Sequence, residues 1–196
     1  MAHAARLKDN SCLHLQAATL FAFTMTLSTR AKTPKLASDI KASSAAAVDK
    51  PLYIVRDSKV HGKGVFAARK IAAGTQIIEY AGERISWKDA DRRHNANNPD
   101  STHTFFFSLE NRKVIDGGSQ GNDARWINHS CAPNCGAREE NKRIFIYALR
   151  DIKRGEELNY DYGLVLEERY TAKLKRSYQC LCGASTCRGT LLAPKR

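Results

Sequence analysis

The sequence lacks a long apolar run, and none of its 196 residues lie in a segment able to cross a bilayer as a helix. A weaker apolar run at residues 13–27 follows Arg6 and Lys8, as in a cleaved signal or transit peptide, but three threonines and other polar residues dilute it. We therefore expect no membrane contact. Residues 1–50 are expected to be a disordered or targeting extension, or in part the product of a start before the true Met25.

Cysteine is also scarce, and the six cysteines are too sparse and too clustered for the disulfide framework of a small secreted protein. They are Cys12, Cys131, Cys135, Cys180, Cys182 and Cys187. This usage favours an intracellular, reducing compartment, either the cytoplasm or chromatin. Export as an effector stays open as an alternative.

Acidic residues are few: 20 Asp and Glu stand against 32 Lys and Arg, which gives a formal charge of +12. Such a charge favours electrostatic contact with nucleic acid or with a protein bound to it, although it also serves solubility alone. The sequence has neither the paired Cys and His groups of zinc fingers nor an aromatic RNA-binding run, so no dedicated nucleic-acid module is expected.

Helical periodicity is rare, and short β-branched or aromatic segments separated by turn residues predict a mostly β fold. The expected elements are a hairpin from residues 52–56 and 62–67, strands at 76–83, 104–109, 113–116 and 143–148, a short helix capped by Ser86, and an amphipathic helix at 164–174. The corresponding domain prediction is an extension at 1–50, a catalytic domain at 51–163 and a helix with a metal-binding tail at 164–196.

Two polar segments stand where aliphatic residues would be usual. Residues 125–134 read Arg-Trp-Ile-Asn-His-Ser-Cys-Ala-Pro-Asn, and residues 157–162 read Glu-Leu-Asn-Tyr-Asp-Tyr. The first supplies an amide, an imidazole and a hydroxyl in succession, followed by a turn that would hold them in place. This pattern is typical of a site that binds a polar small molecule.

Both segments resemble the signature motifs of SET-domain protein lysine methyltransferases, and the resemblance extends over about residues 52–192. It implies a SET fold of small curved sheets, in which the Asn-His-Ser-Cys strand passes beneath a loop in a knot-like thread. It also implies transfer of a methyl group from S-adenosylmethionine (SAM) to a lysine side chain.

The resemblance further implies which residues bind SAM: Lys63, Gly64, Phe66, Phe105, Arg125, Asn128, His129 and Leu191. The first three belong to a Gly-x-Gly-x-Phe turn, which on its own is as compatible with an ordinary hairpin. Two positions depart from the family pattern, since Lys63 replaces an aromatic residue and Phe105 replaces a tyrosine. Leu192 is an alternative to Leu191 for packing on the adenine.

Three tyrosines, Tyr80, Tyr160 and Tyr162, match the family's lysine channel and are the predicted catalytic residues. An aromatic channel excludes water and tolerates a methylated cation. Tyr162 takes the position that orients the amine. The hydroxyl of Tyr160 is expected to limit the product to mono- or dimethyl-lysine.

The run Cys180-x-Cys182-x4-Cys187 places three thiols within eight residues, enough to bind one zinc ion if a fourth cysteine joins them. Spacing leaves both Cys131 and Cys135 open as that ligand. The resemblance, to the family's post-SET tail, implies Cys131.

The expected protein substrate is a histone or another basic protein. A non-histone target, such as a ribosomal or nucleoid protein, is an alternative. So is a SET-like module that binds chromatin or a peptide without turnover. A cysteine-rich segment before residue 52 is absent, which argues against the subgroup that carries one.

Overall fold

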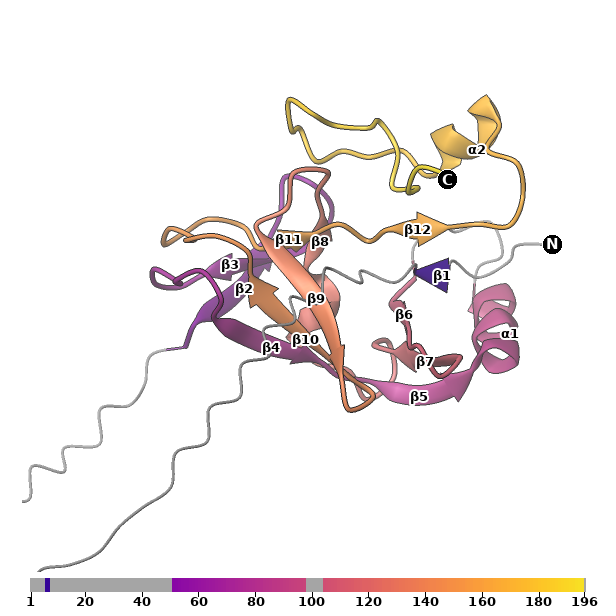
Figure 1. The fold of residues 1–196 in the computed structure, drawn as a ribbon, viewed down its shortest axis with the longest axis horizontal. Helices are drawn as coiled ribbons and strands as arrows, with labels where there is room; N and C mark the ends of the chain where they lie inside the picture. The colour runs from indigo at the N-terminus through magenta and orange to yellow at the C-terminus, as the bar shows by residue number, and fades with distance from the viewer. Residues whose placement is uncertain (1–5, 8–50, 98–103, 196) are drawn as a thin grey trace, which may run out of the picture. The chain divides into compact units, whose positions relative to one another are not determined.

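Short strands dominate the part of the chain that the structure describes, as the sequence predicts (Figure 1). The computed structural model describes residues 6–7, 51–97 and 104–195. Most of the expected extension at residues 1–50 and Cys12 therefore lie outside the described residues. The elements are β1 (Arg6–Leu7), β2 (Tyr53–Asp57), β3 (Lys63–Ala67), β4 (Gln76–Tyr80), β5 (Glu83–Ser86), α1 (Trp87–Asn97), β6 (Phe106–Ser108), β7 (Lys113–Asp116), the 3₁₀ helix η1 (Asp123–Trp126), β8 (Asn128–His129), β9 (Cys135–Glu140), β10 (Arg143–Ala148), β11 (Asn159–Tyr160), β12 (Leu164–Val165) and α2 (Ala172–Ser177).

The predicted N-terminal hairpin is present as the antiparallel pair β2–β3. Gly62 has φ +46°, a conformation that glycine adopts without strain, and its carbonyl accepts the Ser58 N–H at 2.8 Å. β3 is buried along almost its whole length, whereas β2 alternates between exposed and half-buried positions. The hairpin therefore presents β3 to the core and leaves β2 as an edge.

A three-stranded antiparallel sheet in the order β4–β10–β9 forms the centre of the core. In β10, Ile144, Ile146 and Ala148 point inward and alternate with more exposed residues, the period expected of a half-buried strand. β9 was not predicted because its residues, Cys-Gly-Ala-Arg-Glu-Glu, have low strand propensity. Pairing with β10 alone makes it a strand.

The second sheet, in the order β5–β7–β6, carries α1 beside it. As predicted, Ser86 caps α1: its Oγ accepts the Asp89 N–H at 3.1 Å. The strand expected over 76–83 is instead divided, with β4 ending at Tyr80 and β5 beginning at Glu83. The chain passes very close to β7 at Gly82, where an added Cβ would lie 2.4 Å from the Asp116 carbonyl oxygen, so this break needs a glycine.

The prediction of an amphipathic helix at residues 164–174 is wrong. Leu164–Val165 forms β12, which pairs with β1, and Leu166 is buried. The only helix in this part of the described chain is α2, whose N-cap Thr171 accepts the Leu174 N–H at 3.1 Å. Tertiary contacts thus use these leucines in an extended segment and override their helical spacing.

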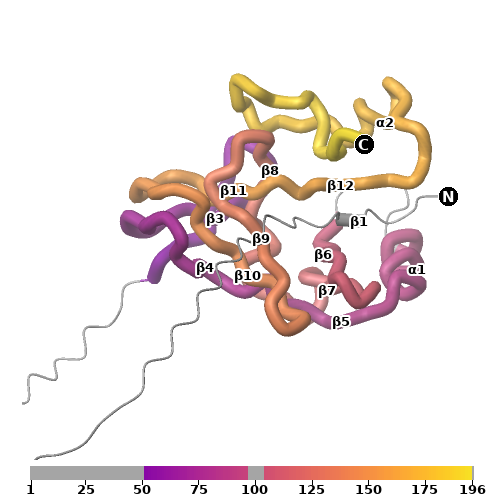
Figure 2. The backbone as a smooth tube through the Cα atoms, in the orientation of Figure 1, coloured from indigo at the N-terminus to yellow at the C-terminus, as the bar shows by residue number. Residues whose placement is uncertain are grey.

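The two polar segments meet in the parallel pair β8–β11 (Figure 2). The register of this pair sets Asn128 beside Asn159 and His129 beside Tyr160. Asn134 is buried and fixes this arrangement: its N–H donates to Asn159 Oδ1 at 3.1 Å, and its Oδ1 accepts the Asn159 N–H at 2.9 Å. Within the described ranges, no helix has the length and apolar character needed to cross a membrane.

Candidate active site and metal centre

One cavity gathers most of the predicted site residues. Eight of the residues predicted for catalysis or cofactor binding line it: Lys63, Tyr80, Phe105, Arg125, Asn128, Tyr160, Tyr162 and Leu191. Gly64, Phe66 and His129 do not line it. Phe107, Trp126 and Leu164 also line the cavity, and none of them was predicted as a site residue.

The aromatic rings form a continuous wall on one side of the cavity. The ring centroids of Tyr160 and Tyr162 lie 5.0 Å apart, those of Tyr160 and Phe107 6.1 Å apart, and those of Phe107 and Tyr80 5.2 Å apart. Phe107 connects the three predicted tyrosines. The run of three phenylalanines at 105–107 was the sequence signal for it, and all three side chains line the cavity.

Two of the tyrosine hydroxyls are held by backbone carbonyls. The Tyr162 hydroxyl donates to the Ile127 carbonyl at 2.9 Å, and the Tyr80 hydroxyl donates to the Phe105 carbonyl at 2.8 Å. Burial, and then the neighbouring tyrosines, raise the pKa of Tyr80 and Tyr160, and burial followed by Glu157 raises the pKa of Tyr162. All three side chains are therefore neutral at physiological pH, and none is a base there.

His129 lies directly behind the tyrosine wall and is buried. Its Nδ1 accepts the Tyr162 N–H at 3.1 Å, and its Nε2 lies 3.3 Å from Cys131 Sγ. Burial lowers the pKa of His129 to about 4, although Asp161 opposes this shift. The imidazole is therefore neutral, and because Nδ1 accepts, its proton belongs on Nε2. His129 thus holds the backbone of Tyr162 and does not touch the cavity.

Asn128 joins the glycine turn to the second polar segment. Its Nδ2 donates to the Lys63 carbonyl at 3.0 Å and to Glu157 Oε1 at 2.8 Å. A Cβ added to Gly64 would lie 2.4 Å from the same Glu157 oxygen, so the close approach at Gly64 is to Glu157. Glu157 was missed as a site residue, although it begins the second polar motif.

Arg125 is a cation in the cavity wall. Its guanidinium carbon lies 4.7 Å from the Trp126 ring centroid and 6.0 Å from that of Phe105, and Nη1 donates to the Gly117 carbonyl at 3.2 Å. Its Nε is buried and has no partner among the described residues. Phe66, by contrast, is buried in β3 and stacks under the Arg56 guanidinium at 3.8 Å, away from the cavity.

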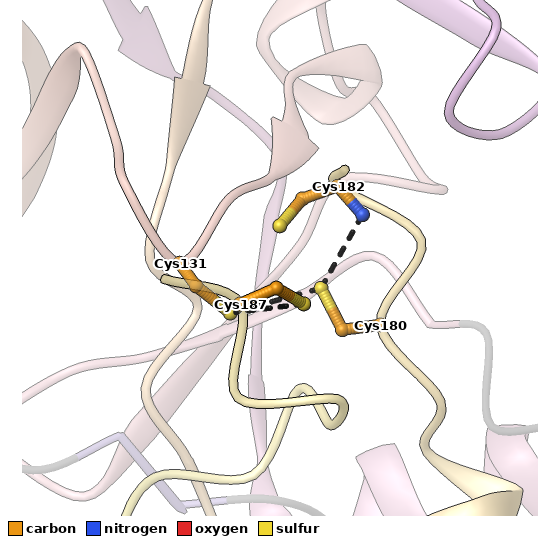
Figure 3. A group of neighbouring side chains, drawn as sticks. All are labelled: Cys131, Cys180, Cys182 and Cys187. Carbon is orange, nitrogen blue, oxygen red and sulfur yellow. Dashed lines mark hydrogen bonds between the residues drawn. The ribbon is translucent and has the colours of Figure 1, made fainter. Parts of the chain in front are cut away.

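Figure 3 shows four cysteines converging from two segments: Cys131, Cys180, Cys182 and Cys187. Their sulfur atoms all lie within 4.8 Å of one another, with Cys131 Sγ 3.7 Å from Cys180 Sγ and 4.0 Å from Cys187 Sγ. Four thiolates about 2.3 Å from a tetrahedral zinc ion stand ~3.8 Å apart. The four sulfurs therefore fit one zinc ion.

Cys135 does not join this group. It is 1% exposed in β9, opposite Ala148, and burial raises the pKa of its thiol to about 12. The structure thus distinguishes the two candidates that sequence spacing left open: Cys131 is the cysteine next to the tail cluster, and Cys135 is a core residue.

Hydrogen-bond donors around the sulfurs suit thiolates. The Arg188 N–H points to Cys131 Sγ at 3.4 Å, and the Gly189 N–H points to Cys187 Sγ at 3.3 Å. Burial opposes ionisation of the Cys182 thiol, but neighbouring N–H groups and thiols lower its pKa to about 6. Burial instead raises the pKa of Cys131 and Cys180, so ionisation of these two thiols requires the compensating charge of a metal ion.

A family model described as "SET domain" matches residues 62–163 of this sequence. The chain belongs to the SET-domain family. The predicted fold class is confirmed: a mostly β SET fold of small sheets with short helices and a C-terminal cysteine cluster that fits zinc. The exact domain bounds at 51–163 and 164–196 stay predictions.

Relatives of this SET domain are named as histone-lysine methyltransferases. One from Candida albicans, "Histone-lysine N-methyltransferase, H3 lysine-4 specific", is 39% identical over 178 residues, 83% of this chain and 17% of the relative. "Histone-lysine N-methyltransferase 2B" from Homo sapiens is 41% identical over 135 residues, 67% of this chain and 5% of the relative. The chain therefore spans only a small part of the proteins that it matches.

A solved structure shares the fold at 33% sequence identity and a TM-score of 0.53, over 58% of this chain and 15% of that chain. It is described as "ctPRC2 in an autoinhibited conformation bound to S-adenosylmethionine".

Proposed function

We propose that this SET-domain chain is a SAM-dependent protein-lysine N-methyltransferase. The observation that carries the proposal is the meeting of Tyr80, Tyr160 and Tyr162 with Asn128 and Arg125 at one cavity. The names of the relatives support the same reaction class.

The lining of the cavity fits both ends of SAM. Lys63 and Arg125 are cations suited to a carboxylate, and the Arg125 Nε is still without a partner among the described residues. The faces of Phe105 and Trp126 and the side chain of Leu191 suit a flat adenine. When bound, SAM supplies the methyl group as a sulfonium. A tyrosine-lined wall accommodates that cation because ring faces attract positive charge.

The tyrosine wall also prepares the substrate. A lysine amine must lose its proton before it can attack, and its ordinary pKa of about 10.4 opposes this at neutral pH. Removal of water by the wall of Tyr160, Tyr162 and Phe107 lowers the pKa of an inserted amine. Because the tyrosines remain protonated, the proton leaves to solvent and Tyr162 serves to orient the amine.

The proposed substrate is a lysine in a histone or similar basic protein, as in the names of the relatives. A non-histone basic protein is the alternative within the same reaction. The charge of +12 supports electrostatic contact with nucleic acid that carries such a protein. A zinc site of four thiolates supports a reducing compartment.

Tyr162→Phe tests the reaction assignment. We expect turnover on a validated substrate to fall by about 100-fold, because the variant loses the hydroxyl that fixes the ring to the Ile127 carbonyl. SAM affinity should stay close to that of the wild type. The substrate is first identified by incubation with labelled SAM and a panel of basic proteins, followed by mass spectrometry. If the wild type binds SAM but labels nothing, a non-catalytic peptide-binding module becomes the better assignment.

We also propose that the product is mainly mono- or dimethyl-lysine. Tyr160 lines the cavity, and in this proposal its hydroxyl takes the space that a third methyl group would need. Each further transfer also requires the nitrogen to rotate into line again. Tyr160→Phe should raise the trimethyl fraction in mass spectra with little change in SAM affinity. Dominant trimethyl-lysine from the wild type would contradict this role for Tyr160.

A further inference from the structure

Arg188, the residue after the last cysteine of the tail, joins the tail to the catalytic segment. Its Nη1 donates to Asp161 Oδ2 at 2.5 Å and its Nη2 donates to Asp161 Oδ1 at 2.9 Å. The two side chains are only 25% and 35% exposed, which limits screening by solvent. Two parallel charge-assisted bonds fix the orientation of both groups as well as their distance. Asp161 stands between Tyr160 and Tyr162, so this pair acts on the backbone that carries both tyrosines.

The ion pair is one part of a closed ring of contacts. The Arg188 N–H points to Cys131 Sγ at 3.4 Å, and Cys131 Sγ lies 3.3 Å from His129 Nε2. On its other side, His129 Nδ1 accepts the N–H of Tyr162 at 3.1 Å, and the ring closes through the chain because Tyr162 follows Asp161. We call Arg188, Asp161, His129 and Cys131 the latch ring. It links one predicted zinc ligand, Cys131, to the Asp161 carboxylate and to the Tyr162 N–H.

The tail has a second attachment that is independent of the latch ring. Leu192 is 2% exposed and bridges to Leu164, and the Ala193 N–H donates to the Leu164 carbonyl at 2.8 Å. This attachment holds the tail on β12. It does not involve Asp161. Weakening the Arg188–Asp161 ion pair can therefore leave the tail attached to β12 while it frees the backbone of residues 160–162.

We propose that Arg188 is a positioning residue, through which the zinc-bound tail sets the orientation of Tyr162 for methyl transfer. The proposal rests on the proposed function for its effect on turnover. Its structural content is that the Asp161–Gly163 backbone is held by the Arg188 fork as well as by the hydrogen bond from the Tyr162 N–H to His129. A lysine in place of Arg188 keeps the charge but cannot form the planar fork.

The test uses the full chain with Arg188→Lys and, separately, Asp161→Asn, which lies outside the cysteine cluster. Zinc content by elemental analysis, SAM affinity by titration, and kcat and KM on a validated substrate are measured for each. We expect one zinc per chain, SAM affinity within about twofold of the wild type, and kcat lowered about tenfold or more, the size of effect that slight misplacement of a reacting group produces. The double variant should be little worse than either single variant, since both remove the same contact.

Arg143→Lys is the matched control. Arg143 also forms a forked pair with a carboxylate, that of Glu79, between β10 and β4. It has no contact with the latch ring, so the same chemical change there should leave kcat unchanged.

Amide hydrogen exchange gives a readout that needs no turnover. The Tyr162 N–H donates to His129 Nδ1 and the Gly163 N–H donates to Asp161 Oδ1 at 2.9 Å, so both amides report on the latch ring. In Arg188→Lys and Asp161→Asn their exchange should be faster, while the exchange of the cysteine cluster and the β10 amides stays as in the wild type. Unchanged exchange at residues 162–163 in both variants would overturn the proposal whether or not the protein is an enzyme. Loss of zinc, or faster exchange throughout the tail, in both variants would show that the pair only holds the tail. A wild type without turnover, but with the expected exchange changes, would reject the proposed function and keep the latch ring.

Discussion

The sheets before Gly163 and the tail after it are held together by different forces. The core clusters around fully buried aliphatic residues such as Val65, Ile144, Ile146 and Leu158, each of which gains about 1.5–3 kcal/mol from burial. In residues 164–195 only Leu166, Cys180, Thr190 and Leu192 are buried, and α2 buries none of its residues. The tail therefore depends on its cysteine cluster, on Leu192 and on the Arg188–Asp161 pair, whereas the core has a large apolar cluster of its own.

Zinc removal should separate the two regions and have the largest effect. Structural zinc in small domains contributes on the order of 10 kcal/mol of binding free energy that is coupled to folding. A chelator, or Cys180→Ser, should release about one zinc per chain by elemental analysis and abolish turnover, because Leu191 of the tail lines the cavity. In hydrogen exchange, amides of residues 178–192 should become unprotected while those of β4 and β10 keep their protection. Loss of protection in both regions together would show that the core also depends on the metal.

Cys135→Ser makes the same substitution as Cys180→Ser, but in the core. We expect it to lower the stability of the core and to leave the zinc content unchanged. A serine hydroxyl in this apolar position would be buried without its preferred partners, at a cost of about 1–3 kcal/mol in the free energy of unfolding. Zinc content should stay at one per chain, because Cys135 lies outside the cluster. Thermal unfolding reports the stability of Cys135→Ser and Cys131→Ser, and elemental analysis reports their zinc content. Zinc loss in Cys135→Ser with retention in Cys131→Ser would mean that the ligand assignment is wrong.

The sequence predicted the core better than the tail, for a reason visible in the same comparison. The strands at 113–116 and 143–148 were predicted with the bounds that the structure has, and in 143–148 burial on one face imposes a period of two on the sequence. Residues 164–174 carry apolar residues near helical spacing, but Leu164 pairs with β1 and bridges to Leu192, partners that lie far away in the sequence. Local periodicity holds no information about such partners, and the helix was therefore predicted wrongly.

Much of the candidate site was also predictable, but its contacts were not. The resemblance indicated Asn128, His129 and the three tyrosines, and four of the predicted residues that line the cavity, Arg125, Asn128, Tyr160 and Tyr162, come from the two polar motifs. It gave no indication that Gly64 is required beside Glu157, that Phe66 faces the core, or that Arg188 reaches Asp161 across 27 positions of sequence. Each of these depends on a long-range approach of two segments, which neither propensity nor spacing encodes.

The smallest expected effect is on the stability of the fold at low pH. It tests whether an ion pair at Glu156 helps to stabilise the core. Glu156 accepts from Arg150 at 2.5 Å, from Asn134 Nδ2 at 3.1 Å and from the Lys153 N–H at 3.1 Å. Arg150 is the main cause that lowers the pKa of Glu156 to about 2, with Asn134 and the Lys153 amide adding to it against the effect of burial.

Because the pKa of Glu156 is lower in the folded state, the unfolded chain binds the proton first as pH falls. The stability that Glu156 contributes is therefore fully present above about pH 4.5, its ordinary pKa, and is lost as pH falls towards about 2. Partial exposure screens the pair, so we expect only about 1 kcal/mol. Glu156→Gln should lower stability at pH 7 and lose less on acidification than the wild type, as measured by unfolding midpoints between pH 7 and pH 3. Acid also protonates the zinc thiolates, but both proteins share that loss, so it cancels in the difference between them. Glu110→Gln removes an exposed carboxylate elsewhere and is the control; parallel curves for the wild type and Glu156→Gln would mean that this ionic contact adds nothing to the core.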